Sequence, residues 1–152
     1  MVGLKWSDID FDAMEITVNR TRRHGKDSTP KTEKSKRVIP VFNELVPYIE
    51  AQYELTGEYD SYVFLTQWKK PFNDSHRIRD FHWKKLLVKC GLGYRRIYDT
   101  RSTFATMMLN TGKFTVNQIA QILGHTNVQM IFTRYNKFIK SEIKQINRDI
   151  GL

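Results

Sequence analysis

Cysteine is almost absent from this 152-residue sequence, which contains Cys90 alone. A single cysteine excludes a disulfide bond within the chain. It also argues against a zinc site, because the four histidines do not stand at metal-ligand spacing around it: His24, His76, His82 and His125. We therefore expect no zinc site, and we expect Cys90 to be a small buried hydrophobic side chain.

Long hydrophobic runs are missing as well. The sequence has no stretch of 18 apolar residues, and its start, "MVGLKWSDID", is not a basic-then-apolar signal segment. Hydrophobic residues still make up 40% of the chain, which is enough for the core of one domain of this length. These features predict a soluble, cytoplasmic protein without a membrane-spanning segment.

Acidic residues are too few to balance the basic ones. The chain has 25 Lys and Arg against 16 Asp and Glu, and residues 17–37 alone hold eight basic and two acidic residues. Such uncompensated charge favours a polyanion as the partner, with nucleic acid ahead of a membrane surface. The candidate DNA-binding residues are Arg20, Arg22, Arg23, Lys26, Lys34, Lys36 and Arg37.

Two segments predict a small antiparallel sheet. In "DAMEITVNRTR" the apolar Met14, Ile16 and Val18 alternate with polar residues, and "KRVIPV" (36–41) is a second strand. The polar link "HGKDSTPKTEKS" between them predicts one long hairpin with a basic tip. "WSDIDF" predicts a third short strand, and "YVFL" (62–65) predicts a short strand or an extended segment.

Helical patterns follow the sheet. Asn43 is expected to cap a helix over "ELVPYIEAQYEL", although Pro47 moves the start of its regular part towards Val46. The segment "SHRIRDFHWKKLLVKC" carries a rough apolar face that ends at "GLG". The residues expected to form that face are Phe81, Leu86, Leu87 and Val88.

Two further helices are marked by their ends. One contains Phe104 and is stopped by "NTG" (110–112), and Thr115 is expected to cap "VNQIAQIL" before Gly124 ends it. Gly124 places His125 at a corner, ahead of a further helix capped by Thr126 or Asn127. The tail carries an isoleucine stripe. The sequence thus predicts an α+β fold, with a small three-stranded antiparallel sheet and a basic hairpin packed on a mainly helical body.

Four residues stand out as candidates for chemistry: Lys31, Arg101, His125 and Tyr135. Each has a simpler explanation when it is taken alone. Lys31 is one lysine of an exposed loop, Arg101 could bond a carbonyl, and His125 could be satisfied by backbone. Tyr135 could pack its ring and wet its hydroxyl. In one straight helix, His125 and Tyr135 would lie about 15 Å apart, so a shared site requires the chain to bend between them.

In their order along the chain, four segments resemble the tyrosine recombinase, or phage integrase, family. They are "LKWSDID", "PKTEKSKRVIP", "DTRSTFAT" and "LGHTNVQMIFTRY". The resemblance covers almost the whole chain and implies the family's C-terminal catalytic domain over 1–152. It implies a sheet and hairpin over 1–41, a helical body with the active site over 42–135, and a C-terminal helix over 136–152.

The resemblance also implies a reaction. In that family a tyrosine attacks a DNA phosphodiester and forms a 3′-phosphotyrosine, and no metal or cofactor takes part. Tyr135 corresponds to the nucleophile, Arg101 to the second clamp arginine and His125 to a phosphate donor. Lys31 corresponds to the general acid, with Lys34 or Lys36 in its place if the register differs. An arginine fork suits the charge on phosphorus, and a lysine can protonate the leaving oxygen.

The sequence departs from the family pattern at two points. The family places a histidine three residues before the arginine, and here that position is Tyr98, which can donate a hydrogen bond but is a poor proton acceptor near neutral pH. The first clamp arginine of the family would fall upstream of Met1. We therefore expect a fragment that is weak or inactive by itself and binds DNA without sequence preference.

The expected partners are double-stranded DNA and other protomers, as a tetramer on DNA. The isoleucine stripe of the tail either packs in cis on its own domain, which is the more general interpretation, or belongs to a C-terminal helix that exchanges between neighbours. The competing interpretation is a DNA-binding regulator without catalysis, because "TVNQIAQILGHTNVQMIFTRY" also resembles a helix-turn-helix with Gly124 at its turn. A regulator would not need a hydroxyl on Tyr135. A membrane-surface protein is disfavoured, because the basic residues do not share one amphipathic helix.

Overall fold

The structure is a computed structural model that describes residues 2–29, 36–125 and 129. Contacts divide the chain into two compact units, Met1–Ile97 (unit 1) and Tyr98–Leu152 (unit 2), so the predicted helical body 42–135 is divided between them. Several predicted features lie outside the described residues: Lys31, Lys34, Tyr135, the helix after Gly124, and the isoleucine stripe of the tail.

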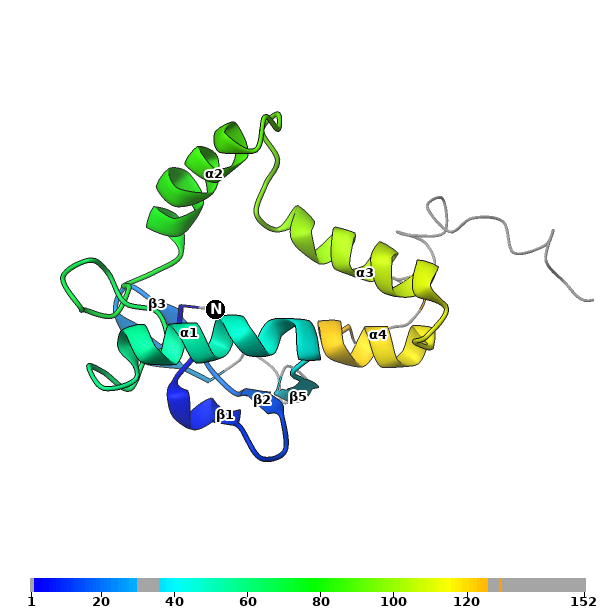
Figure 1. The fold of residues 1–152 in the computed structure, drawn as a ribbon, viewed down its shortest axis with the longest axis horizontal. Coiled ribbons are helices and arrows are strands. Elements are labelled where there is room, and N and C mark those ends of the chain that lie inside the picture. The colour runs from blue at the N-terminus through cyan, green and yellow to red at the C-terminus, as the bar shows by residue number, and fades with distance from the viewer. Residues whose placement is uncertain (1, 30–35, 126–128, 130–152) are drawn as a thin grey trace, which may run out of the picture. The chain divides into compact units, whose positions relative to one another are not determined.

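A three-stranded antiparallel sheet opens unit 1, as predicted. Its strands are β1 (Ile9–Asp10), β2 (Glu15–Val18) and β5 (Arg37–Pro40), in the order β1-β2-β5 (Figure 1). A 3₁₀ turn, η1 (Trp6–Asp8), leads into β1. Ile16 lies opposite both Ile9 and Ile39 in the register. Because side chains alternate between the two faces of a sheet, these three isoleucines lie on the same face.

The link between β2 and β5 differs from the prediction. Instead of one long hairpin, it contains a separate two-stranded sheet of β3 (Thr21–Arg23) and β4 (Lys26–Ser28). The turn residues His24 and Gly25 have φ values of 49° and 74°. Two consecutive positive φ values are typical of a type I′ hairpin turn, which usually has Asn-Gly or Asp-Gly, so the sequence "HG" gave only a weak signal.

The core of unit 1 lies between the sheet and helix α1 (Val46–Thr56). Its buried residues are Ile9, Ile16, Val41 and Val63, and α1 packs Val46 and Ile49 against them. The regular helix begins at Val46 with Pro47 in its first turn, as expected. The predicted N-cap at Asn43 is wrong, because a 3₁₀ turn, η3 (Asn43–Leu45), stands before the helix and moves its first residue beyond the reach of that side chain.

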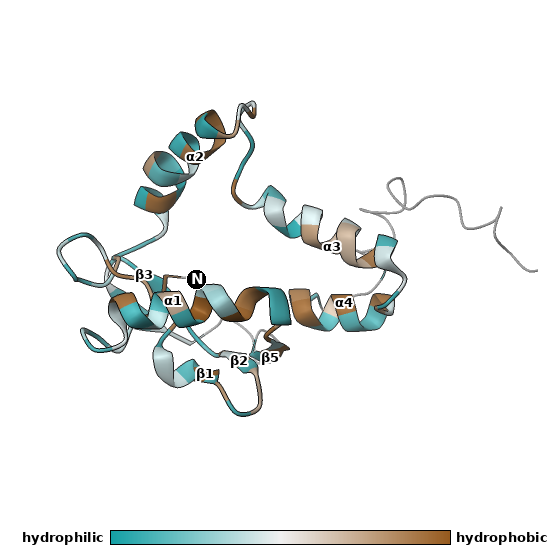
Figure 2. Ribbon diagram, viewed as in Figure 1, coloured by the Kyte–Doolittle hydropathy of each residue, from teal (hydrophilic) through white to brown (hydrophobic). Residues whose placement is uncertain are grey.

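The segment 62–65 is extended, as predicted, and makes isolated bridges from Tyr62 to Lys5 and from Leu65 to Pro71. The following helix is π-helical over η4 (Ile78–Trp83) and continues as α2 (Lys84–Lys89). Its predicted apolar face is wrong. Leu87 is buried, but Phe81, Leu86 and Val88 are exposed, and Figure 2 shows hydrophobic and hydrophilic residues interleaved along α2.

Cys90 follows α2 and is exposed, so its predicted burial is also wrong. The side chain sits where the helix has just ended, beside Gly91 with its positive φ of 64°. None of the helices in the described ranges is long and apolar enough to cross a membrane.

Unit 2 is built from α3 (Asp99–Thr111) and α4 (Val116–Leu123). Ala105 from α3 is buried against three residues of α4 that the sequence placed inward: Ile119, Ala120 and Leu123. The predicted ends are confirmed. Thr115 forms a capping box with Gln118 at the start of α4, and Gly112 and Gly124 end the two helices in the left-handed conformation.

Candidate functional site

Arg101 joins the two helices of unit 2. It lies in the first turn of α3, and its Nη2 donates a hydrogen bond to the carbonyl oxygen of Leu123, the last residue of α4. The last carbonyls of a helix lack partners within the helix and carry partial negative charge, so a guanidinium there satisfies an acceptor and opposes the helix dipole. One role of Arg101 is therefore to cap α4.

The hydrogen bond to Leu123 engages only one of the guanidinium nitrogens of Arg101. The Nε of Arg101 is buried and has no hydrogen-bond partner among the described residues. A buried donor without an acceptor is destabilising by about 1–3 kcal/mol. Buried polar groups usually have a partner, so this Nε is an exception that calls for an explanation.

His125 is fixed at the corner by its backbone. Gly124, at a φ of 68°, donates from its N–H to the carbonyl of Gln121, and the N–H of His125 donates to the carbonyl of Ala120, each at 2.9 Å. These two bonds form a Schellman motif, which sets the direction in which the chain leaves the helix. Both imidazole nitrogens of His125 are buried, so a ligand reaches them only when the side chain or its surroundings move.

Three of the predicted site residues therefore gather in unit 2. The carbonyl that Arg101 holds belongs to Leu123, two residues before His125. Tyr98 lies just before α3 with its side chain 56% exposed, and its ring centre is 5.9 Å from the guanidinium carbon of Arg101. Lys31 and Tyr135 lie outside the described residues. In the part of the chain that the structure describes, no group of His, Cys, Asp and Glu is arranged to hold a metal ion.

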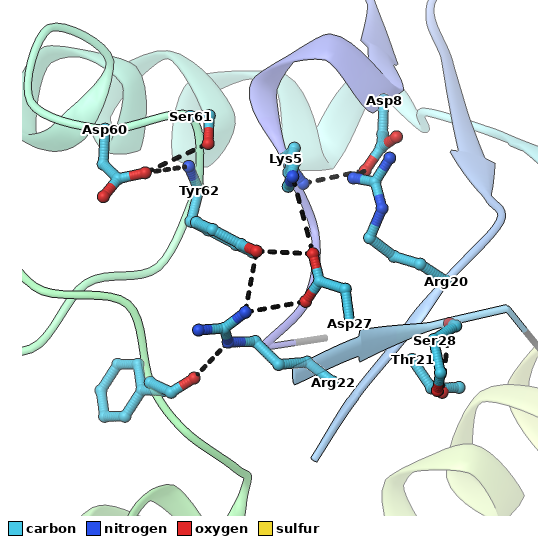
Figure 3. Close-up of polar contacts among 11 residues, drawn as sticks. Lys5, Asp8, Arg20, Thr21, Arg22, Asp27, Ser28, Asp60, Ser61 and Tyr62 are labelled. Atoms are coloured by element: carbon cyan, nitrogen blue, oxygen red, sulfur yellow. Dashed lines mark hydrogen bonds and ion pairs between the residues drawn. The ribbon is translucent and has the colours of Figure 1, made fainter. Parts of the chain in front are cut away.

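A second polar cluster, which the sequence did not reveal, lies in unit 1 around Arg22 (Figure 3). Its Nη1 donates to Asp27 and to the hydroxyl oxygen of Tyr62, both at 2.8 Å, and its Nε donates to the Phe72 carbonyl at 2.7 Å. The Arg22 side chain is only 11% exposed. A residue predicted to bind DNA thus ties the β3–β4 hairpin to the segments that contain Tyr62 and Phe72.

The partners of Arg22 also bond each other. The hydroxyl of Tyr62 donates to Asp27 at 2.5 Å, and Lys5 Nζ lies 3.5 Å from the same carboxylate. Burial acts to raise the pKa of Asp27, but the hydrogen bonds from Tyr62 and Arg22, with the charges of Arg22 and Lys5, lower it below its ordinary value. Burial and the hydrogen bond to Asp27 raise the pKa of Tyr62.

Arg20 is held in a similar way. Its Nη1 lies 2.6 Å from Asp8, whose side chain is nearly inaccessible and also accepts the backbone N–H of Lys5. Among the predicted DNA-binding residues, Arg20 and Arg22 are therefore engaged by carboxylates of their own unit. Arg23, Lys26 and Lys36 are exposed, and Arg37 is half-buried.

Solved structures that match this fold include a transposon integrase and a recombinase. The Tn1549 transposon integrase in complex with circular intermediate DNA matches 96% of this chain and 54% of its own, with a TM-score of 0.77 at 22% identity. The XerA recombinase matches 97% of this chain and 52% of its own, with a TM-score of 0.74 at 22% identity. The sheet and helices described above thus have the fold of these two proteins.

The sequence model of the Phage integrase family matches residues 1–142, and the chain belongs to that family. The XerC-like tyrosine recombinase of Caldanaerobacter subterraneus subsp. tengcongensis is 26% identical over 93% of this chain. The ICEBs1 integrase of Bacillus subtilis is 26% identical over 96% of it. The chain spans 42% of the length of each of these relatives.

Proposed function

We propose that the chain carries the catalytic centre of a site-specific DNA recombinase, which cuts and rejoins strands through a 3′-phosphotyrosine. The observation that carries the proposal is the buried, unsatisfied Nε of Arg101 beside the rigid corner of His125. A phosphate oxygen is the acceptor that suits a guanidinium already fixed by a second hydrogen bond. Family membership supports the same chemistry.

The proposed step is a phosphoryl transfer. The hydroxyl oxygen of Tyr135 bonds to phosphorus, its proton passes to a base, and the bond from phosphorus to the 5′-oxygen breaks. Lys31 gives the leaving oxygen a proton, with Lys34 or Lys36 in that role if the register differs. The 5′-hydroxyl of another strand reverses the step, so the bond energy is retained and neither water nor a metal is consumed.

Arg101 and His125 are the proposed donors to the charge that develops on the phosphate. The hydrogen bond to Leu123 preorganises the Arg101 guanidinium for this role, whereas the buried imidazole of His125 reaches a phosphate only when its side chain or its surroundings move. Tyr98 is exposed next to Arg101 and can donate a third hydrogen bond.

Double-stranded DNA is the proposed substrate, and its phosphates are the proposed partners of the exposed cations Arg23, Lys26 and Lys36, together with Lys34 and Arg37. Exchange between two duplexes requires four strand cleavages and hence four nucleophilic tyrosines. We propose that four protomers supply them, with a C-terminal helix exchanged between neighbours. The bacterial relatives act on DNA, so the bacterial cytoplasm is the proposed compartment.

A helix-turn-helix regulator remains the alternative function. The corner at Gly124 is compatible with a recombinase and with a helix-turn-helix regulator, because a Schellman motif can turn the chain after a helix in either class of protein. The buried Nε of Arg101 favours the recombinase, because a regulator has no use for an internal phosphate site.

Covalent capture tests the proposal without knowledge of the target site. The protein is incubated with random-sequence duplexes that carry one nick, so that cleavage near the nick releases a short end and traps the covalent complex. Denaturing electrophoresis detects the complex, and mass spectrometry locates the modified residue. We expect DNA on Tyr135, at low yield, and none with Tyr135→Phe. Unchanged DNA binding by both proteins, with no adduct on either, would support the regulator instead.

A further inference from the structure

Unit 1 contains a polar cavity that the proposed reaction does not use. It measures about 380 Å³ and lies between the β3–β4 turn and the segment 74–79. Its lining consists of three arginines, two histidines, one serine and one aspartate. A water molecule fills roughly 30 Å³ in the liquid, so the cavity has room for a phosphate group together with several waters.

Two hydrogen bonds hold the walls of this cavity together. The N–H of Gly25, in the hairpin turn, donates to the carbonyl oxygen of Asn73 at 2.9 Å, and Arg22 Nε donates to that of Phe72 at 2.7 Å. Gly25 permits the close approach, because an added Cβ would lie 3.1 Å from the side-chain oxygen of Asn73 and its φ is positive. One wall contact is thus between backbone groups, and the other comes from the largely buried side chain of Arg22.

The carboxylates around the cavity already have donors. Asp27 accepts from Arg22 and Tyr62, and Asp74 accepts the backbone N–H of His76 at 2.8 Å. Arg79 makes two hydrogen bonds with the carboxylate of Asp80, at 2.9 and 2.8 Å. Arginines therefore match Asp27 and Asp80, whereas Asp74, the carboxylate of the lining, has the imidazole Nδ1 of His76 at 3.8 Å.

Arg23 differs from Arg22 and Arg79, the other two arginines of the lining, which bond to carboxylates. It is exposed, lines the cavity, and makes no hydrogen bond or ion pair through its side chain with any other described residue. Ser75 adds a hydroxyl, and His24 and His76 add imidazole rings to the same lining. A guanidinium with hydroxyl and imidazole donors around it is suited to the oxygens of one phosphate group.

We propose that this cavity binds a single phosphate of the DNA backbone, with Arg23 as its principal cation. The residues of this cavity belong to unit 1, whereas Arg101 and His125 belong to unit 2. The inference rests on DNA as the proposed substrate, and it adds a defined anchoring point on the β3–β4 hairpin.

The salt dependence of DNA binding tests this site. Fluorescence anisotropy measures the affinity of the Tyr135→Phe protein for a labelled duplex between 50 and 200 mM salt, because each phosphate contact adds about 0.9 to the slope of log K against log salt concentration. We expect Arg23→Gln to weaken binding and reduce this slope by about 1, and Arg23→Lys to preserve the slope. Lys89→Gln is the matched control, since it removes one charge from an exposed residue outside the cavity.

Equal slopes for Arg23→Gln, Lys89→Gln and the parent would overturn the proposal. Inorganic phosphate distinguishes the source of the ligand, through NMR shifts of the His24 and His76 rings with His82 as the internal reference. If phosphate shifts these rings in an Arg23-dependent way while the slopes stay equal, the cavity binds a small phosphorylated molecule and the DNA assignment is wrong. A reduced slope without covalent capture would leave this site intact and reject the proposed cleavage alone.

Discussion

Arg22 and Arg101 are both partly buried, yet their surroundings differ. Arg22 has a carboxylate, a phenol hydroxyl and a backbone carbonyl around its guanidinium, and the carboxylate matches its charge. Arg101 has a backbone carbonyl and no carboxylate partner in the described residues, and its Nε is buried without an acceptor. Arg22 is thus held by groups of its own unit, whereas the Nε of Arg101 is the donor that we propose for the reacting phosphate.

The difference shows why charge alone is a poor guide to function in this chain. The eight basic residues of 17–37 look alike in the sequence, but Asp8 and Asp27 engage two of them within unit 1. A paired buried cation is retained for structure, and removal of one partner exposes the other to the cost of desolvation. The cations without such partners are the ones to test against DNA.

The largest expected effect concerns Arg101. Arg101→Lys keeps the charge but removes the planar fork, so we expect covalent capture by Tyr135 to fall by about 10²- to 10³-fold. The stability of unit 2 should fall by about 1 kcal/mol or less, because a lysine can still oppose the dipole of α4. Rates come from capture time courses and stability from urea unfolding. A large loss of stability with an unchanged rate of covalent capture would show that Arg101 has a structural role, as Arg22 does, and contradict its role at the phosphate.

Arg22 should show the opposite profile. Arg22→Ala leaves Asp27 and Tyr62 without their shared donor, and we expect a loss of about 2 kcal/mol in the free energy of unfolding. Arg23→Ala is the matched control on the same strand, and its exposed side chain should change stability by about 0.5 kcal/mol or less. Urea unfolding followed by tryptophan fluorescence measures both. Equal effects of the two substitutions would remove the distinction between structural and available cations.

Substitution of Tyr98 in unit 2 should change the rate of covalent capture less than substitution of Arg101 does. Tyr98→His introduces the histidine that the family has at this position, which is exposed and beside Arg101. A histidine there can also donate a hydrogen bond to the phosphate, and a new acid–base group changes the rate only when it is correctly placed. We therefore expect the rate of covalent capture to stay within about tenfold of the parent rate. Time courses of capture by the two proteins provide the comparison. Complete loss of phosphotyrosine formation would refute the proposed placement of this residue at the reacting phosphate.

The smallest expected effect is a dependence of the stability of unit 1 on pH, through Asp27. The pKa of Asp27 is lowered in the folded protein, so its contribution to stability is present above the unfolded pKa of about 3.9 and is lost as pH falls through the folded value. The stability difference between the parent and Asp27→Asn should therefore be constant from pH 7 to about 5 and should shrink below about pH 4. Urea midpoints at each pH measure it. A difference that grows on acidification would reverse the assigned sign.

The sequence predicted features that depend on neighbouring residues. The apolar alternation of β2, the Thr115 cap and the ends at Gly112 and Gly124 are local signals, and each is confirmed. The π-helical turn, the exposed apolar residues of α2 and the 3₁₀ turn at Asn43 were missed, because tertiary packing decides them. The I′ turn was missed because histidine is an unusual residue for its first position.

For the site, the sequence identified Arg101 and His125 through their family resemblance, but it could not show that Arg101 caps α4. That contact spans 22 residues and depends on the packing of α3 against α4. Arg22, Asp27 and Tyr62 carry no motif, and their cluster joins residues 40 positions apart. Only the fold brings such residues together.

The central claim is that the Arg101–His125 corner binds the reacting phosphate. A crystal structure of the protein grown in sulfate tests it most directly, since sulfate has the shape and charge of that group and requires no knowledge of the DNA site. We predict a sulfate that accepts hydrogen bonds from Arg101 Nε and from an imidazole nitrogen of His125. Sulfate bound elsewhere on the protein, with this corner occupied only by protein groups, would contradict it.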